Sequence, residues 1–334
     1  MTRQVMLRFV LLVIATIPFY GYATDKILII NSYHSDLDWV SGASNKIQEV
    51  LGDEYEYHIY DMDTKRIPRE EFQSRADIAF EKVKELKPAI VFLGDDNALR
   101  LLGKKLNDNQ VYTVFYGINS NPRNYFDGKN VGKLKYVDGV LERPLLKRSI
   151  LYLKKINKNL EQIRILFDKS PTSEIIFLDV FNGKETNIFN GVKVHVNLIS
   201  NFDTWKEEVG KLSNQENTIL IMSMMHRIKA ESGDGFVGYE SVAEWTSENT
   251  PIPLYGFWNV AVGKKKAIGG FVLFGEAQGE AAGQIAKKIL EGDTKGNLIP
   301  VTAEKGRLLF SKTQLEKWNI SLPENIETKA TLVD

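Results

Sequence analysis

Apolar and polar residues alternate along the chain in blocks that follow the order strand, loop, helix. Residues 27–30 form an apolar run that ends at the polar and aromatic loop Asn31–Trp39. Apolar residues then recur at helical spacing, at Val40, Ala43, Ile47, Val50 and Leu51. A strand that is apolar on both faces is typical of a parallel sheet covered by helices on both sides. Because ligands collect at the carboxyl ends of such strands, the loop Asn31–Trp39 is the first candidate for a binding site.

The same order recurs twice more in the first part of the chain. Further strands are predicted at 55–61, 89–93 and 111–116, and helices at 70–86 and 98–106. Asp96 or Asn97 is the expected N-cap of the helix at 98–106. Repetition of this unit predicts a doubly wound α/β domain.

A second series of strands and helices begins near residue 137. Strands are predicted at 137–141, 163–167, 192–198, 218–222 and 252–257. Helices are predicted at 145–156, 174–182, 204–212 and 241–249. This series predicts a second α/β domain of similar size.

The last part of the chain is too short to form a third domain. It contains a predicted strand at 267–274, a loop at 275–279, a helix at 280–290, a strand at 305–310 and a short helix at 315–318. We expect these pieces to complete the two sheets, which requires the chain to cross several times between the domains.

The first 23 residues have the pattern of a cleaved signal peptide. Arg3 and Arg8 form a positive n-region, an apolar run follows at 9–17, and small residues precede the predicted cleavage after Ala23. The apolar run is too short for a stable membrane span, although an uncleaved anchor is the alternative. The pattern predicts export, most plausibly to a periplasm.

Composition narrows the chemistry that the chain can perform. The 334 residues include 43 basic and 43 acidic side chains and no cysteine. The balanced charge gives no indication of a nucleic-acid partner. The lack of cysteine excludes disulfides, thiol catalysis, thiolate zinc sites and a lipoprotein anchor. We therefore expect a soluble exported protein without a cofactor.

The ends of the predicted strands carry aromatic, carboxylate and amide side chains. They are Tyr33, His34, Asp36, Trp39, Asp95, Asp96, Asn97, Tyr116, Asn119, Glu142, Asp168 and Trp258, with the segment from Ser223 to His226 at a further strand end. Two such edges that face each other would line a cleft for a small molecule. For any one of these residues, a helix cap or a core position is the alternative explanation.

Other motifs give weaker predictions. Asp95 and Asp96 are candidates for an acid–base pair, but neighbours in a turn rarely aim at one atom, and capping explains at least one of them. Glycines at 233, 235 and 238 match the dinucleotide fingerprint only by letter, because the preceding strand ends about ten residues earlier. The four histidines lack metal-ligand spacing, and His34 and His226 are the pair expected to meet across the cleft.

Several segments resemble the ABC-transporter substrate-binding protein family with the type I periplasmic-binding fold. They are Ile29–His34, Val91–Ala98, Val114–Asn119, Gly139–Glu142 and Gly275–Gly292. The resemblance implies two doubly wound parallel-sheet lobes joined by a three-strand hinge, with ligand capture between them. It places residues 24–136 and 260–292 in lobe 1, and residues 137–259 and 293–334 in lobe 2.

The sequence thus predicts a periplasmic solute-binding protein that is not an enzyme. Its ligand would be an amino acid, an amine or another small polar solute, and its partner an ABC permease. Tyr33, Trp39, Tyr116 and Trp258 would stack on the ligand, while the carboxylates and Asn119 would hydrogen-bond to it. The alternatives are a ligand-sensing partner of a membrane receptor, such as a kinase or cyclase, and an exported enzyme that uses Asp95, Asp96 or His34.

Overall fold

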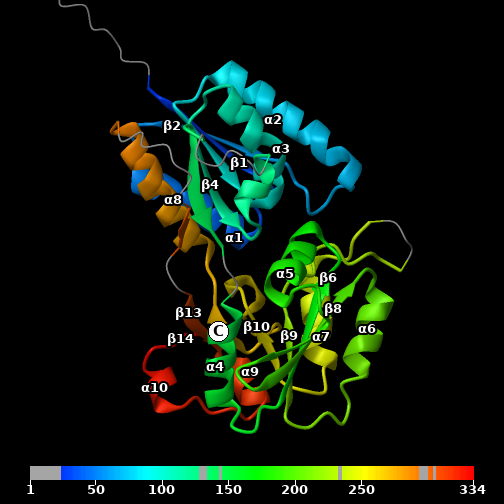
Figure 1. Ribbon diagram of the computed structural model, residues 1–334. Helices are drawn as coiled ribbons and strands as arrows, with labels where there is room; N and C mark the ends of the chain where they lie inside the picture. Colours follow the sequence, from blue (N-terminus) through cyan, green and yellow to red (C-terminus); the bar gives the residue numbers. More distant parts are fainter. Residues whose placement is uncertain (1–23, 128–133, 143–144, 232–234, 293–299, 304–305) are drawn as a thin grey trace, which may run out of the picture.

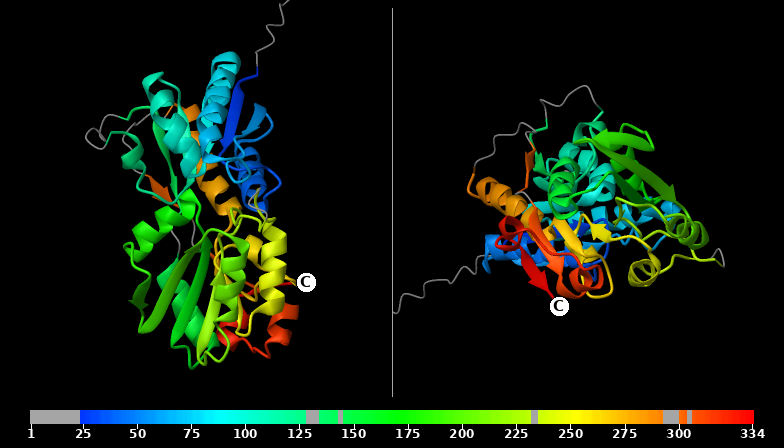
Figure 2. Two further views of the ribbon diagram at one scale, coloured as in Figure 1. Left: turned by 90° about the vertical axis from the view of Figure 1, so that its right-hand side faces the viewer. Right: turned by 90° about the horizontal axis from the view of Figure 1, so that it is seen from below.

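Two α/β lobes lie one above the other in the computed structural model (Figure 1). The structure describes residues 24–127, 134–142, 145–231, 235–292, 300–303 and 306–334. The side view in Figure 2 shows the same two stacked lobes. The predicted signal peptide and part of the glycine motif near 233 lie outside the described residues. Among the residues that are described, no helix has the length and apolar character needed to cross a membrane.

Lobe 1 is built on a six-stranded sheet whose strands all run parallel to one another. Its order is β12 (Val301–Thr302), β5 (Val137–Leu141), β4 (Thr113–Ile118), β3 (Ile90–Gly94), β1 (Lys26–Asn31) and β2 (Glu56–Asp61). Its helices are α1 (Asp38–Leu51), α2 (Phe72–Leu86), α3 (Asp95–Asp108) and α8 (Gly275–Leu290).

The central strand β1 shows why the sequence has a continuous apolar run. Leu28 and Ile30 pack in one core with residues of α2 and α3, while Ile27 and Ile29 pack in another with residues of α1 and α8. Successive side chains of a strand point to opposite faces, so both sets are buried. The prediction of a doubly wound sheet is confirmed.

Lobe 2 is built on a five-stranded sheet that is parallel except at one edge. Its order is β10 (Leu254–Gly256), β9 (Thr218–Met222), β6 (Gln162–Asp168), β8 (Val192–Ile199) and β7 (Thr186–Phe189). Its helices are α4 (Leu146–Ile156), α5 (Pro171–Phe181), α6 (Phe202–Gly210) and α7 (Tyr239–Asn249). The antiparallel edge strand β7 was not predicted, because Thr186–Phe189 is short and only half-buried.

The C-terminal segment differs from the prediction. Strand β12 completes the lobe 1 sheet, but β11 (Gly269–Val272), β13 (Arg307–Ser311) and β14 (Thr331–Val333) form a separate three-stranded sheet. The short helices α9 (Lys312–Lys317) and α10 (Glu324–Glu327) follow β13. Short 3₁₀ helices occur at η1 (Arg69–Glu71), η2 (Pro122–Tyr125) and η4 (Asn259–Ala261).

The chain passes between the lobes at three places, as the three-strand hinge requires. These lie between β5 and α4, between β11 and α8, and between β12 and β13. The sheet to which each strand belongs shifts the predicted division. Strand β5 pairs with β4 in lobe 1, although residue 137 was the predicted start of lobe 2. Strand β11 pairs with β13 outside the lobe 1 sheet, although residues 260–292 were assigned to lobe 1.

Helix α8 also begins earlier than predicted. Residues 275–279, predicted as a loop because of their two glycines, form its first turns. These glycines allow close contact with α1: a Cβ atom on Gly275 would lie 2.0 Å from the carbonyl oxygen of Trp39, and one on Gly279 would lie 2.2 Å from that of Ala43. Helix packing, which a local pattern does not reveal, therefore overrides the low helix propensity of glycine.

Candidate ligand-binding site

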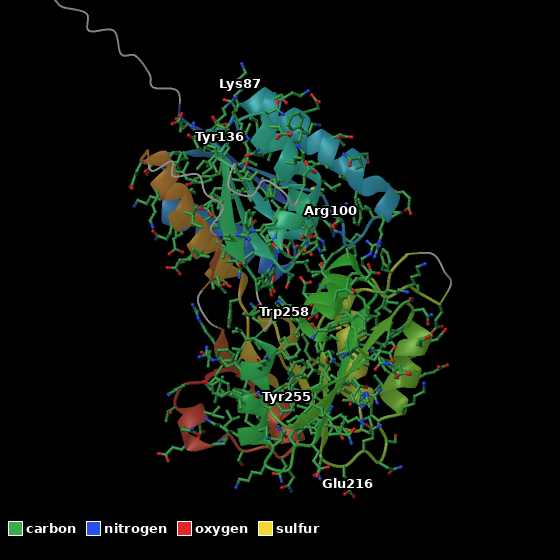
Figure 3. The ribbon with its side chains drawn as sticks, in the orientation of Figure 1. Lys87, Arg100, Tyr136, Glu216, Tyr255 and Trp258 are labelled. Carbon is green, nitrogen blue, oxygen red and sulfur yellow. The ribbon has the colours of Figure 1, made fainter. Side chains whose placement is uncertain are left out.

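A cavity of about 40 Å³ lies where the strand ends of the two lobes meet. Its residues follow β1, β2, β3 and β5 in lobe 1 and β9 and β10 in lobe 2. They are Tyr33, Leu37, Trp39, Lys65, Asp95, Glu142, Ser223, Met224, His226, Trp258 and Val260. Figure 3 shows Trp258 at the junction of the lobes, far from Lys87 at one end of the molecule and Glu216 at the other.

Lys65 places a buried cation in the wall of this cavity. The residue is 5% exposed, and no carboxylate among the described residues lies within 4.0 Å of its ammonium group. The ammonium group lies 4.2 Å from the centroid of the Tyr33 ring, a cation–π contact. Burial lowers the pKa of Lys65, and the carboxyls of Asp168, Asp95 and Glu142 oppose this effect. The cation is therefore desolvated and held mainly by longer-range attraction.

Asp95 places a buried carboxyl in the same cavity on a strained backbone. It is the first residue of α3, it is 4% exposed, and its φ angle of 67° lies in the left-handed region. Strained non-glycine residues of this kind concentrate at functional sites. Burial raises the pKa of Asp95 well above its usual value, and the nearby Glu142 carboxyl raises it further. The positive charge of Lys65 and a hydrogen bond with Tyr33 oppose these effects.

Glu142 occupies the end of β5, where the chain leaves lobe 1. Its Oε1 accepts a hydrogen bond of 2.6 Å from Nε1 of Trp258, and its Oε2 accepts one of 3.1 Å from Nδ2 of Asn119. Burial raises the pKa of Glu142 to about 8. The carboxyl thus fixes the indole of Trp258 as one wall of the cavity.

Direct contacts join the lobes around the cavity. The hydroxyls of Tyr33 in lobe 1 and Thr172 in lobe 2 are 2.8 Å apart. Nη1 of Arg227 in lobe 2 donates to the carbonyl oxygens of Thr64 and Ile67, at 2.7 Å and 2.8 Å.

An ion pair between Arg69 of lobe 1 and Glu174 of lobe 2, at 3.1 Å, adds to these contacts. All of these groups lie within hydrogen-bonding or ion-pairing distance across the lobe boundary. The structure is therefore that of a closed arrangement.

Five of the twelve individually predicted residues line the cavity: Tyr33, Trp39, Asp95, Glu142 and Trp258. Ser223, Met224 and His226 of the predicted segment 223–226 line it as well. Each follows the carboxyl end of a strand, as the rule for open α/β sheets requires.

The other predicted residues lie outside the cavity lining and serve the scaffold. Tyr116 donates to Oδ1 of Asn31, and Asn97 donates to Oγ1 of Thr64. Asp168 accepts from the backbone N–H groups of Ser170 and Arg227 and from the hydroxyl of Ser173. Asn119 supports Glu142, and the side chain of Asp36 is 81% exposed and pairs with Arg66.

Asp96 was predicted to bind the ligand, with Asp96 or Asn97 as the N-cap of a helix at 98–106, but α3 begins earlier, at Asp95. The residue before α3 is Gly94, without a side-chain cap. The Asp96 carboxylate instead accepts from the backbone N–H groups of Asn119 and Ser120 and from the hydroxyl of Tyr125. It therefore holds the loop after β4, and the two neighbouring carboxyls do not line one cavity.

Of the two histidines expected to meet across the cleft, His226 lines the cavity and His34 is not among the lining residues. Burial lowers the pKa of His226 well below its usual value. Nδ1 of His34 lies 3.3 Å from Oδ1 of Asp63, and burial lowers the pKa of His34. Within the described ranges, no three His, Asp or Glu side chains are arranged to hold a metal ion.

The sequence interpretation missed Lys65, Leu37 and Val260. Lys65 follows β2, so the rule that identified the loops after β1 and β3 would have found it. It was not predicted as a cavity residue, because lysine side chains are almost always exposed. Leu37 and Val260 are apolar residues with no local pattern that marks a ligand contact.

Solved structures share this fold at low sequence identity. An ABC domain from Streptococcus pneumoniae in complex with L-Trp has a TM-score of 0.69 and 15% identity, covering 93% of this chain and 100% of that one. A ligand-free, open substrate-binding protein with adhesive properties from Clostridium difficile has a TM-score of 0.63 and 15% identity, covering 93% and 99%. A conserved domain protein from Vibrio cholerae has a TM-score of 0.67 and 14% identity, covering 93% and 100%.

The chain therefore has the two-lobed fold of substrate-binding proteins, as the resemblance predicted. A transcriptional repressor from Staphylococcus aureus matches with a TM-score of 0.56 and 11% identity, covering 84% of this chain and 96% of that one. The same fold thus occurs in regulators. No protein-family model and no curated protein matches the sequence.

Proposed function

We propose that this protein is an exported solute-binding protein that captures a small zwitterion between its lobes and delivers it to an ABC permease. The observation that carries the proposal is that Lys65 and Asp95 both line one buried cavity without forming an ion pair with each other. Buried charges are normally paired or bind a ligand, and neither of these groups has an ion-pair partner within 4.0 Å among the described residues.

A ligand with a carboxylate and an ammonium group matches this pair. The ammonium group of Lys65 binds the carboxylate, and the carboxyl of Asp95 binds the ammonium group. The aromatic and apolar walls formed by Trp39, Trp258 and Leu37 accept a flat or apolar side chain. An amino acid with a large apolar side chain has all three features, and because the closed cavity measures only about 40 Å³, the lobes must part further to hold it.

Two further observations support this proposal. The structurally similar ABC domain holds L-Trp, which has these features. The signal-peptide pattern at residues 1–23 fits a protein that meets its solute outside the cytoplasm. The expected location is a periplasm, where the mature chain is free of the membrane.

A sensing role is the second candidate, because the same fold occurs in a transcriptional repressor. In that case the closed form contacts a membrane receptor in place of a permease. The protein has no chemistry of its own in either role, so the bound solute is released unchanged.

The test is a thermal-shift screen of residues 24–334 against amino acids, amines, sugars, nucleosides and small acids. A solute at 100 times its Kd stabilises the folded state by about 2.7 kcal/mol, which raises the Tm of a chain of this length by about 4 °C. Any hit is then titrated calorimetrically and recovered, to establish that it is unchanged.

Asp95→Asn should reduce the affinity of a zwitterionic hit at least about 10-fold, because it removes a charge-assisted hydrogen bond. Asp53→Asn, a change at an exposed aspartate of lobe 1, is the matched control and should leave the affinity unchanged. Turnover of the solute, or equal loss in both variants, would contradict the proposal.

A further inference from the structure

Two polar side chains on the lobe 2 wall of the cavity have hydrogen-bonding capacity that the protein does not use. Ser223, the residue after β9, is 4% exposed, and its Oγ has no hydrogen-bond partner among the described residues. The same is true of both ring nitrogens of His226, which are also buried. More than nine in ten buried polar groups in proteins have a partner. Two exceptions that line one cavity therefore identify a surface shaped for a ligand.

The environment of His226 fixes both its orientation and its charge. Its ring stacks on Tyr239, with the ring centroids 4.4 Å apart and an interplanar angle of 22°. Burial, reinforced by the positive charge of Lys65, lowers the pKa of His226 well below its usual value. The imidazole is therefore neutral and offers one donor and one acceptor.

The hydroxyl of Ser223 likewise both donates and accepts. The lobe 2 wall thus carries hydrogen-bonding groups without a net charge. By contrast, the lobe 1 wall carries the ammonium group of Lys65 and the carboxyls of Asp95 and Glu142. Met224 and Val260 are apolar members of the same lining on the side of lobe 2. The cavity is therefore chemically asymmetric, with a charged side and a neutral polar side.

We infer that the ligand has two ends: a charged end held by lobe 1, and a neutral hydrogen-bonding group that reaches Ser223 and His226 in lobe 2. The neutral group is a hydroxyl, an amide or a heteroaromatic N–H, and the part that joins the two ends is apolar. This inference rests on the proposed function, because it takes the cavity as the solute site.

Ser223 and His226 are specificity-determining residues in this arrangement. A solute that lacks the neutral polar group leaves both side chains buried and unpaired, which costs about 1–3 kcal/mol for each group. A site built to hydrogen-bond a substrate group rejects analogues that lack it more strongly than an apolar site rejects a missing methylene. We expect the solute with the polar group to bind at least about 10-fold more tightly than its matched analogue.

The test compares solutes that differ by one polar group. The pairs are tyrosine with phenylalanine, tryptophan with 3-benzothienylalanine, and glutamine with norleucine, each titrated calorimetrically into residues 24–334. The expected result is a ratio of Kd values of 10 or more in at least one pair, in favour of the polar member. A ratio near 1 in every pair would overturn the inference.

Variants then locate the origin of the ratio. Ser223→Ala removes only a hydroxyl, and His226→Phe retains a ring that can stack on Tyr239. Each should bring the ratio toward 1, and the double variant should abolish it. A general loss of folding would weaken both members of a pair equally, so the ratio separates specificity from stability. A ratio that persists in the double variant would overturn the inference.

The outcomes also separate this inference from the proposed function. Binding of amino acids that depends on Lys65 and Asp95 but shows no preference in any pair would overturn the inference alone. Failure of all six solutes to bind, together with no hit in the wider screen, would overturn both.

Discussion

At the residue scale, the cavity contains groups that reduce the stability of the fold. Lys65 is desolvated and lacks a close counter-ion, and Asp95 adopts a left-handed backbone angle. Replacing a buried charged group with an apolar residue of similar size is often neutral or stabilising. Because such a residue contributes little to the stability of the fold, we infer that its role is to bind a ligand.

Lys65→Met tests this reasoning. Methionine fills a similar volume without a charge, so the free energy of unfolding should stay the same or rise by about 1 kcal/mol. The affinity for a carboxylate-bearing solute should fall about 10- to 100-fold, because a charge-assisted hydrogen bond is lost. Urea unfolding and calorimetry measure the two quantities.

Lys312→Met is the control, since Lys312 is an exposed lysine at the start of α9, remote from the cavity lining. It should change neither quantity. Reduced stability with unchanged affinity in Lys65→Met would instead make Lys65 a structural residue.

Glu142 should make stability depend on pH. Its pKa is raised from 4.5 to about 8, so the folded state retains a proton that the unfolded state has lost. The stabilisation is complete below about pH 4.5 and is lost as the pH rises toward 8. In the wild type, Glu142 should make the free energy of unfolding fall by up to about 1.4 kcal/mol per pH unit across this window. Glu142→Gln should abolish this fall.

Asp138→Asn is a useful comparison for the unfolding measurements. Burial raises the pKa of Asp138 to about 6, so its contribution should be lost by that pH. Its substitution should change the profile only between about pH 4 and 6. A profile above pH 6 that is identical in the wild type and in Glu142→Gln would show that Glu142 is ionised in the folded protein.

The sequence identified which loops form the cavity better than which side chains enter it. Tyr33 and Tyr116 both lie at strand ends, yet Tyr33 lines the cavity and Tyr116 bonds to Asn31 beneath it. Position after a strand is a local property, whereas the direction of a side chain depends on packing between strands. The same limit applies to Lys65, whose ammonium group lies over the ring of Tyr33 in the cavity wall.

At the element scale, the contact between α1 and α8 explains a glycine pattern that was predicted as a loop. Gly275 and Gly279 face the backbone of α1, where no side chain fits. Local sequence correctly indicated low helix propensity but could not show the neighbouring helix. By contrast, β5 and β9 have the predicted bounds, because each ends where polar residues follow, at Glu142 and at Ser223.

Gly279→Ala should destabilise the protein by about 1–3 kcal/mol or more, because the new Cβ would lie 2.2 Å from the carbonyl oxygen of Ala43. The matched control is Gly210→Ala at the end of α6, where nothing lies within 4 Å of the new Cβ atom. There the change should be neutral or stabilise by about 0.5–1 kcal/mol. Chemical denaturation measures both, and equal stability of the two variants would contradict the proposed steric role of Gly279.

At the scale of the whole molecule, a few polar contacts hold the lobes together beside the cavity. The guanidinium of Arg227 contributes most directly, because it donates to two backbone carbonyls of lobe 1 and stacks over Phe236 of its own lobe, 4.4 Å from the ring centroid. Since both acceptors are main-chain atoms, the bonds require the lobes to be close but do not require a solute. Arg227 should therefore favour the closed form whether or not the cavity is filled.

Arg227→Ala should shift the equilibrium toward an open form. Small-angle scattering of the solute-free protein should show a larger radius of gyration than that of the wild type. The affinity for the solute should fall about 10-fold, because the apparent Kd rises in inverse proportion to the closed population. Saturating solute should restore the compact form, since the solute binds both lobes.

Lys229→Ala separates closure from surface charge. Lys229 lines the same groove as Arg227, but its side chain makes no hydrogen bond or ion pair with another described residue. Its loss should leave the radius of gyration unchanged. If both variants remain compact, the hinge alone holds the closed arrangement. If Arg227→Ala opens the protein without weakening solute binding, closure and solute binding are independent. A partner that binds only the closed form would then not distinguish the solute-bound protein from the solute-free one.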